Sequence, residues 1–145
     1  MKRIFCLAII FALFLTSCSI AVNREKRVRL EICNNDENYI TLTGKVVGVE
    51  IQSPQSLMNV VIECDELKTY FPNATDTHTF LIHSASHLDL EVGDTIEFTT
   101  VRKWSSNKRL TNLPIVAISK NNENILSFQE GKQNLINWIN QLRAL

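Results

Sequence analysis

The feature that most constrains the fold is a series of five short segments, between residues 39 and 120, in which apolar and polar residues alternate. Alternation with a period of two places one set of side chains on each face of a β-strand, so these segments predict half-buried strands. Turn-forming residues separate the segments, and no long helical pattern interrupts them. The predicted strands are residues 40–51, Val60–Cys64, Thr79–Ile82, Thr95–Val101 and Leu113–Ile118.

The first of these strands changes its alternation phase along its length. The apolar residues from Ile40 to Val46 keep one phase, whereas those from Val47 to Ile51 keep the opposite one. Gly44 and Gly48 lie close to the change. A phase change inside a long strand, next to glycine, predicts a β-bulge that bends the strand.

The last segment, residues 121–145, changes to a helical pattern. Apolar residues recur every three or four positions from Phe128 onward, which predicts an amphipathic helix over residues 128–144. Ser127 followed by Glu130 matches a capping box at the start of this helix. Its polar face carries little positive charge, so we expect the helix to pack on the β-structure rather than lie on a membrane surface.

The long bent strand with a central glycine resembles the first strand of an OB-fold. The Val92-Gly93-Asp94 turn, the strand after it and the basic loop that follows are also similar to that fold. The resemblance covers about residues 39–120, and with the flanking segments it implies a mainly β fold. We therefore expect a small five-stranded OB-like β-barrel with an extra N-terminal strand and a C-terminal amphipathic helix. Many OB-folds place a helix between the third and fourth strands, whereas residues 84–89 leave room for only one turn.

Residues 1–17 have the composition of a secretory signal peptide. Lys2 and Arg3 precede an apolar run from Ile4 to Leu15, and small polar residues follow it. The run contains about 12 residues, whereas a helix that crosses a bilayer needs about 20. We therefore expect a leader that is removed, and not a membrane-spanning helix.

Leu15-Thr16-Ser17-Cys18 resembles the lipobox of bacterial lipoproteins. In that family the peptidase cleaves before the cysteine, here between Ser17 and Cys18, and the cysteine then carries acyl chains such as palmitate. The resemblance implies a lipid-anchored protein of the bacterial cell envelope, outside the cytoplasm. An ordinary cleaved signal with an incidental cysteine is the alternative.

Residues 18–38 are predicted to form a tether and an N-terminal strand. Val28, Leu30 and Ile32 alternate with charged residues, which is the period of a half-buried strand. A basic cluster overlaps this segment: Arg24, Lys26, Arg27 and Arg29. Beside a lipid anchor, each such charge would attract anionic head groups by about 1 kcal/mol. A solvated linker that leads into a strand is the alternative, and we favour it.

Two cysteines would remain after signal removal and lipidation, Cys33 and Cys64. Outside the cytoplasm such a pair can form a disulfide bond. Each cysteine also has apolar neighbours, and a buried free thiol is common in such surroundings. The sequence leaves both possibilities open.

The histidines do not have the spacing of a metal site. His78 and His83 differ by an odd number of positions on one predicted strand, so they face opposite sides, and His87 lies beyond the strand. The sequence also contains no glycine-flanked nucleophile and no phosphate-binding loop. We therefore predict no metal, no cofactor and no catalytic residue.

A basic loop with one tryptophan is the best candidate for a ligand-binding surface. Its residues are Arg102, Lys103, Trp104, Lys108 and Arg109. OB-folds bind oligonucleotides or oligosaccharides through the corresponding loop, where an aromatic ring stacks and cations pair with an anionic polymer. A solvated hairpin tip, with the tryptophan packed against the barrel, is the alternative that we prefer.

Composition gives no global argument for a nucleic-acid partner. The chain has 15 Lys and Arg and 15 Asp and Glu, for a net charge of zero. Nucleic acid is also not the usual ligand of an envelope lipoprotein. We therefore expect a membrane-anchored, non-enzymatic binding or accessory module whose partner is an envelope protein or a glycan. The alternative is an OB-type binder of an anionic glycan or oligonucleotide through the Trp104 loop. Neither hypothesis specifies an oligomeric state.

Overall fold

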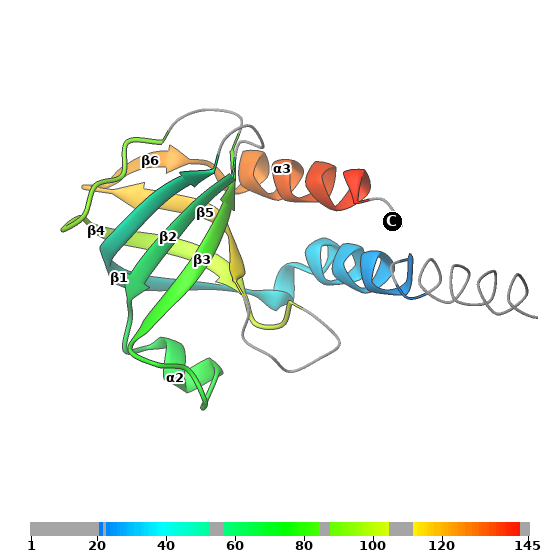
Figure 1. Cartoon of the computed structure of the whole chain (residues 1–145), viewed down its shortest axis with the longest axis horizontal. Helices are drawn as coiled ribbons and strands as arrows, with labels where there is room; N and C mark the ends of the chain where they lie inside the picture. Colours follow the sequence, from blue (N-terminus) through cyan, green and yellow to red (C-terminus); the bar gives the residue numbers. More distant parts are fainter. Residues whose placement is uncertain (1–20, 22, 53–56, 85–87, 105–111, 143–145) are drawn as a thin grey trace, which may run out of the picture.

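The structure of the chain is a computed structural model that describes residues 21, 23–52, 57–84, 88–104 and 112–142. Six strands form one sheet (Figure 1). They are β1 (Tyr39–Gln52), β2 (Leu57–Glu63), β3 (Thr77–His83), β4 (Thr95–Val101), β5 (Leu113–Lys120) and β6 (Glu123–Leu126). Neighbours in the order β3-β2-β1-β4-β5-β6 are antiparallel, and β3 also pairs in parallel with β5. This additional pairing closes the sheet in a ring.

The predicted mainly β fold is confirmed. All five predicted strands are present, and β4 has the predicted bounds. Each of the other four strands extends one to three residues beyond at least one of its predicted ends. Only β2 is also shorter at one end, because it ends one residue before the predicted Cys64. The leader and the lipobox residues Leu15, Thr16, Ser17 and Cys18 lie outside the described residues.

The bend in β1 lies at the predicted position. The register of β1 with β2 shifts between Val46 and Gly48, which is the mark of a β-bulge. Before the bulge β1 pairs mainly with β4, and after it β1 pairs with β2. A Cβ atom at Gly44 would overlap the side chain of Ile62 and lie 2.8 Å from the carbonyl oxygen of Glu63. Glycine is therefore required at position 44, where β1 lies against Ile62 and Glu63 at the end of β2.

The core lies inside the ring. Phe80 on β3 and Phe98 on β4 contact edge to face, with ring centroids 5.0 Å apart, and both are fully buried. Buried aliphatic residues from all five strands of the ring belong to the same core: Leu42, Val60, Ile62, Ile82, Ile96, Ile115 and Ile118. Burial of these side chains supplies most of the stability of the ring, because each contributes about 1.5–3 kcal/mol.

The predicted N-terminal strand is wrong, because residues 23–34 form a helix. Glu25 pairs with Arg29 at 3.2 Å, and Arg27 pairs with Glu31 at 3.7 Å. Both pairs join residues four positions apart, which are neighbours on a helix but not on a strand. The apolar side of this helix packs against the sheet and α3 (Phe128–Gln141), and buries Ile32.

Three further elements, a strand and two short helices, are not predicted from the sequence. Asn121 and Asn122 have φ values of +55° and +65°, which are those of a type I′ hairpin turn. This turn joins β5 to β6, so residues 121–145 contribute a strand as well as a helix. The single-turn helix α2 (Leu67–Tyr70) and the 3₁₀ helix η1 (Asp36–Asn38) connect strands of the ring or lead into it.

The C-terminal helix α3 begins at the predicted residue. The hydroxyl of Ser127 accepts a hydrogen bond of 3.3 Å from the backbone N–H of Glu130, as the capping box predicts. Leu135 and Ile139 are fully buried against the sheet. The prediction that this helix packs on the β-structure is therefore confirmed for Phe128–Gln141, and residues 143–145 lie outside the described residues.

Replacing Ser127 with alanine is expected to lower the free energy of unfolding by about 1 kcal/mol, because the N–H of Glu130 loses its capping acceptor. Urea unfolding measures this change. Gln129→Ala is the matched control, since Gln129 is exposed in the first turn of the same helix. An equal loss in both variants would show that the hydroxyl contributes nothing to the helix start.

Candidate functional site

The candidate site is the junction where helix 23–34, α3 and one end of the ring meet. The guanidinium carbon of Arg29 lies 4.9 Å from the centroid of the Trp104 ring and 5.9 Å from that of Trp138. The carboxylate of Glu25 accepts a hydrogen bond of 3.2 Å from Nε of Arg29. Each cation–π contact of this kind contributes about 0.5–2 kcal/mol, and more where water is excluded. We name Arg29, Trp104, Trp138 and His83 the Arg29 cluster.

His83, the last residue of β3, is the fourth member of the Arg29 cluster. Its ring lies 4.4 Å from that of Trp138, and only 5% of the residue is exposed. Its Nε2 atom has no hydrogen-bond partner within the described part of the chain. Burial, together with the positive charge of Arg29, lowers the pKa of His83 to about 4. The imidazole is therefore neutral at pH 7.

Trp104 is not exposed to solvent. Only 7% of the residue is accessible, and Arg29 covers one face of its ring. The structure therefore agrees with the alternative in which this tryptophan packs against the β-structure, and its ring is not free to stack on a ligand. Lys108 and Arg109 lie outside the described residues.

The other two described cations of the basic loop are exposed. Arg102 and Lys103 both face solvent, and the guanidinium carbon of Arg102 lies 5.5 Å from the ring centroid of Tyr70. Tyr70 is 41% exposed at the end of α2. A small surface with two cations and one aromatic ring therefore remains next to the buried tryptophan.

The predicted basic cluster near the lipid is divided between two roles. Lys26 donates a hydrogen bond of 2.8 Å to the backbone carbonyl of Asn140, near the C-terminal end of α3, where carbonyl groups carry partial negative charge. Arg29 is held within the Arg29 cluster. Arg24 and Arg27 remain exposed. Two of the four cations therefore fix helix 23–34 to the folded body.

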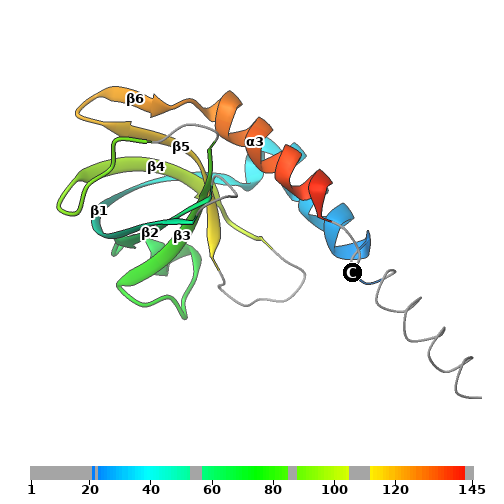
Figure 2. The same cartoon turned by 45° about the horizontal axis from the view of Figure 1, so that its top comes forward.

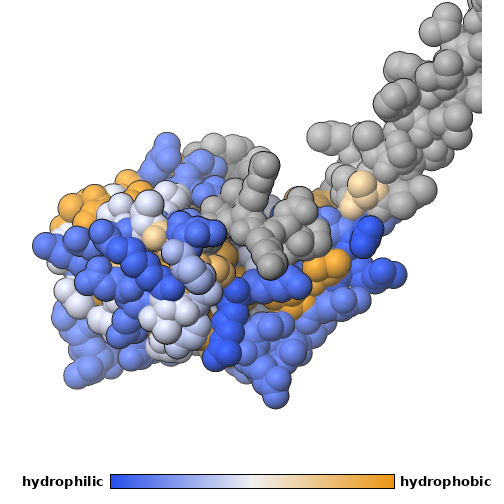
Figure 3. Space-filling view, turned by 90° about the horizontal axis from the view of Figure 1, so that it is seen from below, coloured by the Kyte–Doolittle hydropathy of each residue, from blue (hydrophilic) through white to orange (hydrophobic). Residues whose placement is uncertain are grey.

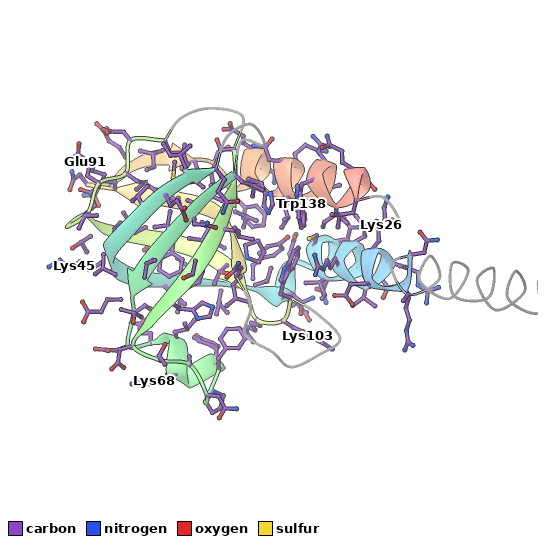
Figure 4. The ribbon with its side chains drawn as sticks, viewed as in Figure 1. Lys26, Lys45, Lys68, Glu91, Lys103 and Trp138 are labelled. Carbon is purple, nitrogen blue, oxygen red and sulfur yellow. The ribbon has the colours of Figure 1, made fainter. Side chains whose placement is uncertain are left out.

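Further contacts attach the C-terminal end of helix 23–34. The Tyr39 hydroxyl donates a hydrogen bond of 2.9 Å to the carbonyl of Cys33, and the Tyr39 ring contacts Phe128 edge to face at 5.0 Å. Lys132 of α3 pairs with Asp36 at 2.8 Å. Figure 4 shows Lys26 and Trp138 between the two helices. The helix is therefore bound to α3 and the sheet from its first turn to its last.

Both remaining cysteines are free thiols, so the disulfide considered from the sequence is not formed in this structure. Cys33 is buried at the end of helix 23–34, whereas Cys64 follows β2 and lies beside Gly44. Burial raises the pKa of Cys33 to about 11 and also raises the pKa of Cys64. Both thiols are therefore protonated at neutral pH and poorly nucleophilic.

No group of three His, Cys, Asp or Glu side chains within the described ranges is arranged to hold a metal ion. His78 and His83 lie on β3 five positions apart, hence on opposite faces, and His87 is outside these ranges. Of the helices in the same ranges, none is both long and apolar enough to cross a membrane.

The described residues on the face shown in Figure 3 are mostly hydrophilic, with apolar residues in small patches. Among the described residues, the most exposed large apolar side chains are Val92 at 67% and Ile51 at 57%.

No protein family, curated protein or solved structure matches this chain. Its function must therefore be inferred from its own residues and their contacts.

Proposed function

We propose that the chain is a non-enzymatic binding or accessory lipoprotein of the bacterial cell envelope, anchored in a membrane through Cys18. The observation that carries the proposal is the lipobox-like sequence that ends at Cys18, and the position of helix 23–34 determines what an anchor there would hold. This helix lies only a few residues after Cys18, and Lys26 and Arg29 attach it to α3 and to the ring. Acyl chains on Cys18 would therefore hold the whole folded body close to the lipid.

The buried titratable groups support a binding role rather than catalysis. A general base needs a pKa near the working pH, whereas the pKa of His83 is lowered to about 4. A thiol nucleophile needs a lowered pKa, whereas the pKa values of Cys33 and Cys64 are raised. These groups stabilise the packing at the junction and beside β1, and none is poised for reaction.

The ring supports the OB-like interpretation of residues 39–120. Its long bulged β1 is shared between β2 and β4, and β1 to β5 form one closed circuit. An OB-type binder of an anionic glycan or oligonucleotide through the Trp104 loop is the second candidate function. Because Arg29 covers Trp104, such a ligand would contact the exposed pair Arg102 and Lys103, with Tyr70 beside them.

The substitution Cys18→Ser tests the anchor. In cells grown with an alkyne analogue of palmitate, the natural chain is expected to carry the label and to sediment with membranes. Cys18→Ser is expected to lose both properties almost completely, because the thiol that would carry the lipid is absent.

Cys6→Ser is the matched control, since Cys6 lies in the apolar run that the peptidase would remove. This variant is expected to behave like the natural chain. A Cys18→Ser protein that still carries the label, or a natural chain that carries none, would contradict the proposal.

A further inference from the structure

We propose that the outer end of the helix pair is the surface that faces the membrane, and that helix 23–34 acts as a rigid spacer between the lipid and the ring. By helix pair we mean helix 23–34 and α3, which lie side by side in both views (Figures 1 and 2). The outer end is the one that carries Arg24, Arg27 and Gln141. This inference rests on the proposed lipidation of Cys18.

The first argument is the reach of the chain. Only residues 19–22 separate Cys18 from Asn23, and five extended steps span at most about 18 Å. The acyl chains would therefore remain near the first turn of the helix. Twelve helical residues rise by about 18 Å, so the ring would begin roughly that distance further from the lipid.

The second argument is that the helix has no free joint within its described length. Lys26 is bound to Asn140 in the first turns, and Arg29 lies between Trp104 and Trp138 at the middle. At the other end, the side-chain amide of Asn38 donates a hydrogen bond of 3.3 Å to the carbonyl of Ile32. A rotation of the helix relative to α3 would break its contacts with Asn140 and Trp138 together.

The third argument is charge. Arg24 and Arg27 are exposed at the outer end, whereas the neighbouring α3 residues Asn140 and Gln141 are uncharged. Arg27 pairs with Glu31 only at the surface, where such a pair is weak. Exposed cations of this kind are attracted to anionic head groups. The outer end is therefore suited to an anionic lipid surface.

The test measures which end of the protein lies near the head groups. The full-length lipidated protein is reconstituted in vesicles of anionic phospholipid that contain a lipid with a nitroxide quencher on its head group. A fluorophore is attached to Gln141→Cys at the outer end or to Glu91→Cys, which lies at the opposite end of the molecule (Figure 4). Cys33 and Cys64 are buried with raised pKa values, so they react slowly and leave the new thiol as the main target.

Quenching at position 141 is expected to exceed quenching at position 91 several-fold. A matched variant carries a flexible Gly-Ser insertion of about 20 residues after Ala21, which has a root-mean-square span of about 25 Å. We expect the insertion to abolish most of the difference between the two labels.

Equal quenching at the two positions without the insertion would overturn the proposed orientation. A difference that survives the insertion would overturn the spacer role, since charge alone would then orient the body. Failure of the lipidation proposal has a separate signature, because the protein would not float with the vesicles in a density gradient.

Discussion

Replacing Gly131 with alanine is expected to lower the free energy of unfolding by about 3 kcal/mol. A Cβ atom at this position would overlap the carbonyl oxygen of Val116 and lie 2.6 Å from its carbonyl carbon. Both atoms belong to the backbone of β5, which is held between β4 and β6, so α3 would have to move away from the sheet. Glycine to alanine in a helix normally stabilises by about 1 kcal/mol, so the expected sign is the reverse of the usual one.

Urea unfolding of Gly131→Ala measures this effect, with Asn137→Ala as the control on the exposed face of the same helix. The control is expected to be neutral or slightly stabilised, because alanine is the better helix former. If Gly131→Ala were as stable as the natural chain, the close approach of α3 to β5 would be wrong.

Lowering the pH from 6.5 to 4 is expected to reduce the free energy of unfolding by about 3 kcal/mol through His83 alone. The pKa of this histidine is about 4 in the folded protein and near 6.5 when unfolded. Between these values the unfolded chain binds a proton that the folded chain does not, so stability falls as the pH falls. Well below pH 4 His83 is protonated in both the folded and the unfolded chain, so the free energy of unfolding falls no further through this group. Burial lowers the pKa of His78 as well, which adds to the loss in the same direction.

The measurement is urea unfolding of the natural chain, His83→Phe and His78→Phe across this pH range. Phenylalanine keeps a ring against Trp138 but does not titrate, so His83→Phe is expected to lose most of the pH dependence. The hydrogen bond with Lys120 also lowers the pKa of Asp94, so this carboxylate adds a loss toward the acid end of the range, but that loss is common to all three proteins. The same slope in His83→Phe and the natural chain would show that His83 is not the responsible group.

The strands of the ring could be predicted because their burial follows directly from alternation. In β4 every second residue from Ile96 to Thr100 is buried, which is the pattern that the sequence shows. The bulge could be predicted for the same reason, since an extra residue in β1 reverses the phase of every side chain after it.

Helix 23–34 was misassigned because alternation over five residues does not distinguish the two structures. Val28 and Ile32 are four positions apart. This spacing places two side chains on the same face of a strand and also on the same face of a helix. The spacing of Glu25 and Arg29, which form an ion pair four positions apart, is the feature of the sequence that indicates a helix. For β6, the corresponding feature is the pair Asn121-Asn122, because two asparagines favour a two-residue turn that joins two strands in a hairpin.

The Arg29 cluster could not be derived from the sequence, because its members come from both helices, the end of β3 and the segment after β4. The sequence draws attention to the basic loop, but the partners of its residues depend on the tertiary structure. Trp104 packs beneath Arg29, which belongs to the N-terminal helix and is far from Trp104 in the sequence. The burial of Trp104 agrees with the alternative in which this tryptophan packs against the β-structure, and not with a ring that is free to stack on a ligand.

The hydrogen bond from Lys26 to Asn140 joins residues that are 114 positions apart. Helix 23–34 therefore cannot complete its docking until α3 has been synthesised. Contacts between residues so far apart in the sequence form late in folding, so the helix would remain undocked while the ring assembles. A chain truncated before Phe128 would lack Trp138 and Asn140, so Arg29 and Lys26 would lose these two partners and the N-terminal helix would lose its attachment to α3.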